Sequence, residues 1–106
     1  MKNEYLDKHV FYGLKDQNTG FDAPYIRYFS QADFKIVLDR IEQLGLGIIG
    51  IEPWKNGNMY DVLAAEDFGL KPEDAQWFRE AFEIFKRRDG DLLYAASYKV
   101  PEKLLK

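Results

Sequence analysis

The dipeptide Asn56-Gly57 is the sequence feature that most constrains how this chain can fold. Both central residues of a type I′ turn need a positive φ, which Gly adopts freely and Asn adopts more readily than most residues. The residues on either side are apolar and partly β-branched, as hairpin strands are. We therefore expect a β-hairpin within residues 45–65, with a two-residue loop at Asn56-Gly57.

A two-residue loop fixes how the two predicted strands pair. Counting outward, Trp54 faces Met59, Glu52 faces Asp61, and the next apolar residues also face each other. Because side chains alternate across a strand, one face of the hairpin is expected to lie in the core. That face is Ile49, Ile51, Pro53, Tyr60, Val62 and Ala64. The opposite face is expected to hold the two carboxylates side by side, where their like charges repel.

Two helices are predicted, one on each side of the hairpin. Ser30 is a favoured N-cap, apolar residues follow at helical spacing, and Gly45 suits a left-handed helix end. Pro72 fits the first position of the second helix, which we expect to end before Asp89. Basic residues fill the last turn of that helix, where they complement its dipole.

Further strands are expected at residues 9–14, 25–29 and 91–100. Counted from Tyr25, the order is β-α-β-β-α-β, that of a ferredoxin-like fold, with an N-terminal strand added. We predict one α+β domain spanning 1–106, with an antiparallel sheet, two helices on one face and the other face open. A tight hairpin between the second and third strands departs from that fold, so the alternative topology is a curled meander with the helices packed on it.

The charge of the chain limits its partners. The net charge is −3 and no basic stripe is present, which argues against nucleic acid and against an anionic membrane surface. Residues 52–74 hold six acidic and two basic side chains, a local charge of −4, so a basic partner would be attracted there. The absence of cysteine excludes disulfides and thiol catalysis and favours the cytoplasm, and no signal peptide or transmembrane run is recognisable.

No motif in the sequence names a reaction. The phosphate-binding, dinucleotide-binding, nucleophile-elbow and zinc-helix patterns are all missing, and we expect no cofactor and no metal. His9 is the single histidine, which excludes a His-rich metal site.

The candidate binding residues are therefore those of the hairpin and the acidic loop after it: Glu52, Trp54, Met59, Asp61, Glu66 and Asp67. We predict a small acidic, non-enzymatic protein that uses them to bind another protein or a cationic ligand. A homodimer formed through the open sheet face is part of this hypothesis. The alternative is a small enzyme in which Glu52 or Asp61 acts as acid or base beside an aromatic wall, with His9 as a further candidate group.

Overall fold

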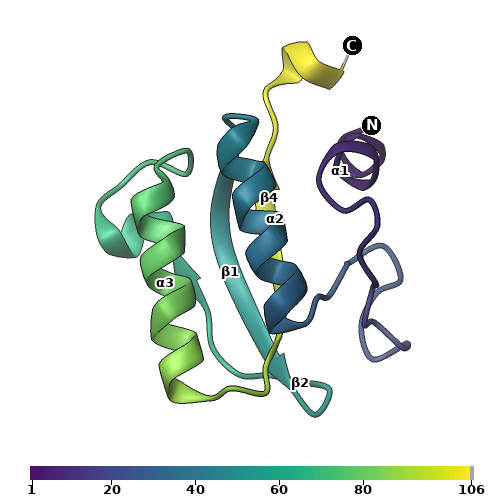
Figure 1. The fold of residues 1–106 in the computed structure, drawn as a ribbon, viewed down its shortest axis with the longest axis vertical. Helices are drawn as coiled ribbons and strands as arrows, with labels where there is room; N and C mark the ends of the chain where they lie inside the picture. Colours follow the sequence, from purple (N-terminus) through teal and green to yellow (C-terminus); the bar gives the residue numbers. More distant parts are fainter. Residues whose placement is uncertain (106) are drawn as a thin grey trace.

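Strand β1 (Gly47–Lys55) is the centre of an antiparallel sheet in the computed structural model, which describes residues 1–105 (Figure 1). Strand β4 (Leu93–Lys99) pairs along one edge of β1. Strands β2 (Asn58–Met59) and β3 (Leu63–Ala64) pair one after the other along its second edge. The strand predicted over residues 91–100 is therefore confirmed as β4.

The hairpin turn has the predicted geometry. Asn56 has φ 54° and Gly57 has φ 78°, so both central residues adopt the positive φ of a type I′ turn. Next to the turn, Trp54 pairs with Met59 as the loop length predicts. The hairpin and its loop are confirmed.

The predicted register does not persist beyond the tip of the hairpin. The Tyr60 N–H donates to the Pro53 carbonyl at 2.9 Å, as expected. Ile51, however, pairs with Leu63 rather than with Val62. Two residues therefore oppose one residue of β1 between these pairs, which is the definition of a β-bulge. The predicted register is wrong from this point onward.

The bulge changes which side chains enter the core. Leu63 packs against the core, whereas Val62 is 43% exposed. A second irregularity, in the pairing of β1 with β4, acts similarly on the start of β1. There Ile48 is fully buried and Ile49 is 47% exposed. The predicted core positions of Ile49 and Val62 are therefore wrong, while the prediction for Ile51 is confirmed.

Helix α2 (Gln31–Gln43) is the first predicted helix. The Ser30 hydroxyl accepts a hydrogen bond from the Asp33 backbone N–H at 3.2 Å, so the N-cap is confirmed. Gly45 has φ 68°, the left-handed conformation expected just beyond the end of the helix.

Helix α3 (Ala75–Arg88) begins later than predicted. Its N-cap is Asp74, whose carboxylate accepts from the Gln76 backbone N–H at 2.9 Å. Pro72 is not the first helical residue because this cap starts the helix beyond it. The Pro72 carbonyl instead accepts from the Ile48 N–H at 2.9 Å and joins the preceding turn to β1.

The N-terminal region contains a helix, and the strand predicted at residues 9–14 does not form. Helix α1 (Lys2–His9) buries Leu6, and Val10 follows four residues later on the same side, which is a helical rather than a strand spacing. The Arg40 guanidinium of α2 donates to the carbonyls of Val10 and Tyr12 at 2.9 and 2.7 Å. These bonds replace the ladder that the predicted strand would have formed.

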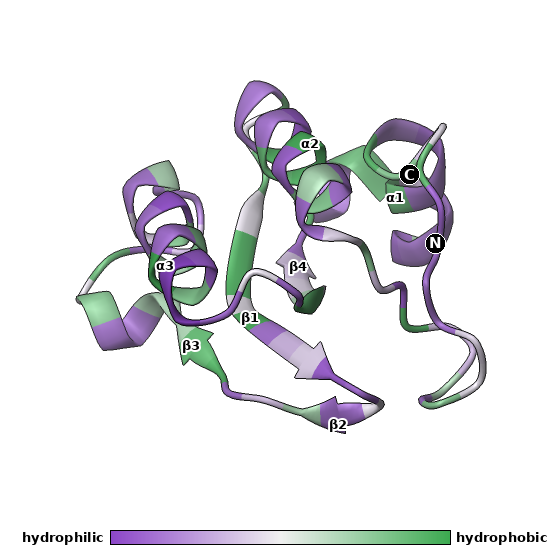
Figure 2. Ribbon diagram, turned by 60° about the horizontal axis from the view of Figure 1, so that its bottom comes forward, coloured by the Kyte–Doolittle hydropathy of each residue, from purple (hydrophilic) through white to green (hydrophobic). Residues whose placement is uncertain are grey.

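The outcome is an α+β domain with an antiparallel sheet, as predicted. The ferredoxin-like order with two helices on one face is not confirmed, since α1 is a third helix and β4 lies antiparallel beside β1. Figure 1 shows α2 and α3 side by side in front of β1, with α1 beyond β4. Figure 2 shows β3 and the first half of β1 as hydrophobic and the second half of β1 as more hydrophilic. Among residues 1–105, no helix is long and apolar enough to cross a membrane.

The core between the helices and the sheet is aromatic around Tyr94 of β4. The ring of Phe34 stacks on Tyr94 with centroids 5.0 Å apart and an angle of 12° between the ring planes. Phe82 of α3 meets the same ring edge-on at 5.1 Å. All three side chains are buried, so Tyr94 joins both long helices to the sheet.

Replacing Phe34 with Ala should therefore lower the free energy of unfolding by about 3–5 kcal/mol, because a large buried ring is lost and a cavity remains. The control Ile36→Ala lies on the same helix at a side chain that is 37% exposed, and should cost about 1 kcal/mol or less. Urea unfolding followed by circular dichroism measures both. Equal losses for the two variants would contradict the core assignment.

Candidate functional site

The hairpin presents one face away from the core, which we call the hairpin surface: Ile49, Glu52, Trp54, Met59, Val62 and Glu66. Ile51 and Pro53 of β1 are buried, so by alternation Glu52 and Trp54 point the other way. Met59 is the direct partner of Trp54 and is 56% exposed. Four of the six sequence-predicted residues lie on this surface, and Ile49 and Val62 join them because of the two register changes.

One end of the hairpin surface is covered by the segment before α2. Tyr28 is fully buried, and its ring centroid lies 5.3 Å from that of Trp54, while the ring centroid of Phe21 lies 5.7 Å from that of Trp54. Trp54 is thus half-buried, because Tyr28 and Phe21 cover part of its side chain. The sheet face predicted to be open is therefore open only in part.

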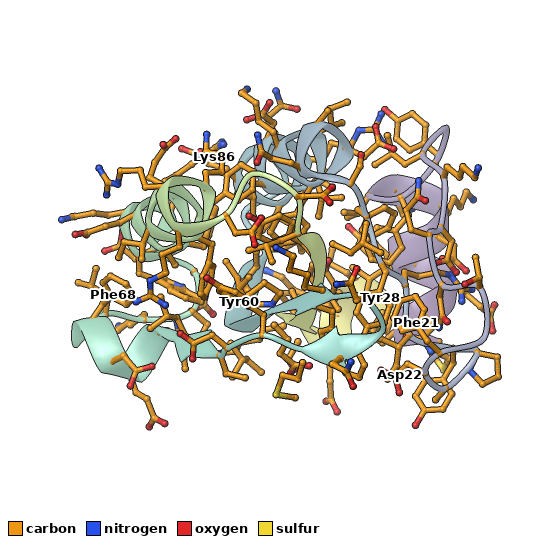
Figure 3. All side chains as sticks on the ribbon, turned by 90° about the horizontal axis from the view of Figure 1, so that it is seen from below. Phe21, Asp22, Tyr28, Tyr60, Phe68 and Lys86 are labelled. Carbon is orange, nitrogen blue, oxygen red and sulfur yellow. The ribbon has the colours of Figure 1, made fainter. Side chains whose placement is uncertain are left out.

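A hydrogen bond holds this covering segment together. The Tyr28 hydroxyl donates to the Asp22 carboxylate at 2.5 Å, and Figure 3 shows these two residues and Phe21 together. Burial raises the pKa of Tyr28 above its usual value, and the bond to Asp22 and the negative charges of Asp22 and Glu52 raise it further. The hydroxyl therefore stays protonated and acts as a fixed donor.

Asp61 does not face Glu52 as a second free carboxylate. It belongs to the bulge, and its oxygens accept from the Val62 N–H at 2.7 Å and from the Arg88 guanidinium at 2.6 Å. The bond from Val62 lowers the pKa of Asp61 most, and Arg88 lowers it further. An acid–base role near neutral pH needs a raised carboxyl pKa, so this geometry does not favour Asp61 as a catalytic group.

The acidic loop forms η1 (Ala65–Phe68), and its two carboxylates differ in position. Asp67 accepts from the Ala64 N–H at 2.8 Å and is used to hold the turn. Glu66 is exposed and lines a pocket of about 270 Å³ together with Ile49. The other residues of this pocket are Ala64, Ala65, Leu70 and Pro72, so its lining is apolar except for one carboxylate.

Both carboxylates of the hairpin surface lack an internal cation among the described residues. Within residues 1–105, neither Glu52 nor Glu66 forms an ion pair, whereas Asp61 and Glu73 pair with Arg88 and Lys99. No three histidine or carboxylate side chains in the described part of the chain converge to hold a metal ion. The unpaired negative charge of the surface is therefore available to a partner rather than neutralised within the molecule.

No protein-family model, curated protein or solved structure matches this chain. What the hairpin surface can bind is therefore inferred from its own side chains: exposed apolar groups beside carboxylates without internal partners.

No local sequence signal predicts that Phe21 and Tyr28 pack on Trp54 of the hairpin surface. The turn formers of residues 15–20 do predict a reversal of the chain, and Asn18 closes it by donating to the carbonyls of Ala23 and Ile26, each at 3.0 Å. Nothing local, however, indicates that the reversed segment folds onto Trp54. The aromatic richness of residues 21–29 is the only signal that this segment is packed.

The pKa of Asp61 provides a test of this site. In wild-type protein, NMR titration should place it below the ordinary value of about 3.9, and Arg88→Gln should move it upward without restoring it fully, because the Val62 bond remains. The neighbouring substitution Arg87→Gln should leave it unchanged. An unaltered pKa in Arg88→Gln would contradict the ion pair.

The same interaction sets a pH dependence. A lowered folded-state pKa stabilises the protein above the unfolded pKa, and this contribution disappears as the pH falls through the folded pKa. The loss of stability caused by Arg88→Gln should therefore be about 0.2–1 kcal/mol at neutral pH, since both side chains are exposed, and should vanish in acid. Urea unfolding of the wild-type and Arg88→Gln proteins at neutral and at acid pH measures this difference in the free energy of unfolding.

Proposed function

We propose that this chain is a small protein-binding module that docks a partner segment with apolar and basic residues on the hairpin surface. The observation that supports this most is the exposure of Ile49 on β1, Met59 on β2 and Val62 just before β3. Exposed apolar side chains that share one face of a sheet and are bordered by polar residues are typical of protein interaction sites.

The charge of the surface argues for a basic partner. Glu52 and Glu66 lie beside the apolar side chains and have no internal cation within the described residues. A symmetric dimer of this chain would bring like charges together, which disfavours a second copy as the occupant. A Lys or Arg of a partner would instead pair with these carboxylates while apolar residues cover Ile49 and Val62.

The enzymatic alternative is supported less well. It requires Glu52 and Asp61 to share one site and one of them to have a raised pKa. Neither requirement is met by Asp61, because it is bound by Arg88 and Val62 at the bulge and its pKa is lowered. Binding therefore remains the proposal that the geometry supports best.

A basic amphipathic Leu/Lys peptide is the probe for this proposal, with a Leu/Glu peptide of the same pattern as the charge control. NMR shifts should concentrate on the hairpin surface and weaken with salt for the Leu/Lys peptide only. The double variant Ile49→Ser/Val62→Ser should weaken binding about tenfold, since that corresponds to losing roughly two buried CH₂ groups. The double variant Ile36→Ser/Leu44→Ser removes comparably exposed groups from α2 and from its C-cap, and it should bind normally.

Equal effects of the two double variants, or shifts away from the hairpin surface, would count against the proposal. Light scattering on the purified protein tests whether a second copy of this chain covers the hairpin surface instead. A dimer that Ile49→Ser/Val62→Ser dissociates would make a second copy of this chain the partner of the surface.

A further inference from the structure

Within residues 1–105, the outer edge of β4 is paired with another backbone segment at one point only. Phe29 and Tyr94 exchange both of their backbone hydrogen bonds, at 2.9 and 2.8 Å, and form an isolated bridge. If the chain before Phe29 continued as a strand, the antiparallel register would place Arg27 opposite Ala96. No such pairing occurs, so the sheet edge beyond Tyr94 lies open at this position.

The bonding pattern leaves the backbone of Ala96 without a partner. In an antiparallel ladder, alternate residues direct both N–H and C=O to the same edge. Tyr94 bonds outward to Phe29, so Ala96 and Tyr98 also point outward, away from β1. Lys2 Nζ donates to the Tyr98 carbonyl at 3.0 Å. Ala96 has no hydrogen bond on this edge to any of residues 1–105.

The space beside Ala96 is a real pocket. It has a volume of about 270 Å³, near the low end for small-molecule sites (~300 Å³), and α1, residues 25–27 and β4 form its walls. Leu6, Phe11 and Ile26 supply apolar lining, and Lys2 contributes charge. Figure 1 shows α1 lying on the other side of β4 from β1.

Residues 25–27 are held away from β4 by bonds of their own. The Ile26 N–H donates to the Ala23 carbonyl at 3.0 Å in a turn. Arg27 donates to the Pro24 carbonyl at 2.9 Å and to the Asp7 carboxylate at 3.2 Å. These contacts fix the wall of the pocket and keep the chain's own segment from closing over Ala96.

We infer that the pocket beside Ala96, which we call the edge groove, binds a short extended peptide segment of a partner protein. The segment adds to the sheet by pairing with Ala96. In β-strand addition, the main chain of a peptide pairs with free groups of a sheet edge while a pocket accepts one of its side chains. Ala96 offers one free N–H and C=O pair beside such a pocket. This interaction surface is separate from the hairpin surface and does not depend on the function proposed for it.

The charges around the groove specify the peptide further. Asp7 pairs with Arg27, so those two charges offset each other. Lys2 forms no ion pair within residues 1–105, although its ammonium group lies against the Tyr98 carbonyl at the groove. A carboxylate on the peptide would pair with Lys2, so the preferred occupant is an extended segment with an acidic residue beside its apolar side chain.

Hydrogen exchange of the free protein tests the basis of this inference. The amides of Ala95 and Ser97 point toward β1 and should exchange slowly, whereas the amide of Ala96 between them should exchange fast. Slow exchange at Ala96 in the free protein would overturn the inference, because it would mean that residues 25–27 already cover the edge.

The peptide acetyl-Val-Thr-Val-Asp-amide tests the occupant. Saturating peptide should slow exchange at Ala96 and shift the amide resonances of Ala96, Ser97 and Tyr98. Replacing Asp of the peptide with Asn should weaken binding about two- to five-fold, the usual range for an exposed charge pair.

Two lysine variants test whether Lys2 causes the difference between the Asp and Asn peptides. Lys2→Gln keeps a donor for the Tyr98 carbonyl but removes the charge, so it should abolish the difference between the Asp and Asn peptides. Lys8→Gln is the matched control on the same helix, at a residue outside the pocket, and should preserve the difference. An absence of shifts at β4 with the Asp peptide, or an equal effect of the two variants, would overturn the inference.

Discussion

The pairing of β1 with β4 is the interaction on which the rest of the structure depends. It is the longest ladder of the sheet, from Gly47–Lys99 to Trp54–Leu93. Ile48 and Ile51 project from it into the core, and Tyr94 presents its ring to both long helices. Each of the two proposed binding surfaces lies along one side of this two-stranded centre, so its register fixes what both surfaces present.

Local sequence signals determined the parts of the fold that were predicted correctly. The Asn56-Gly57 turn, the Ser30 cap and the left-handed Gly45 each need only a few neighbouring residues, and each is present. Residues 25–29 failed as a strand for the opposite reason. Their intrinsic preference is extended, but only Phe29 reaches β4, because turns and side-chain bonds hold the preceding residues elsewhere.

The sequence predicted which segment holds the hairpin surface, but not how the side chains of that segment are arranged. Asp61 of the bulge before β3 binds Arg88, which is distant in sequence and belongs to α3. No hairpin pattern includes that information, and a one-residue change of register moves each following side chain to the opposite face. The same change that removed Asp61 from the predicted carboxylate pair brought Val62 to the outside, so the surface became more apolar and less acidic than the sequence suggested.

Pro53 limits how far the strands beside β1 can pair with it. Its missing N–H lies on the edge that faces β2, where its carbonyl receives the Tyr60 N–H. Together with the bulge, it divides that side of the hairpin into β2 and β3, each of two residues. Edges so short and interrupted offer little template for another chain, since uncontrolled pairing needs a continuous row of free backbone groups. The hairpin thus exposes apolar side chains on its face without also presenting a long free edge, so the binding proposed for that face does not need the edge pairing that leads to fibrils.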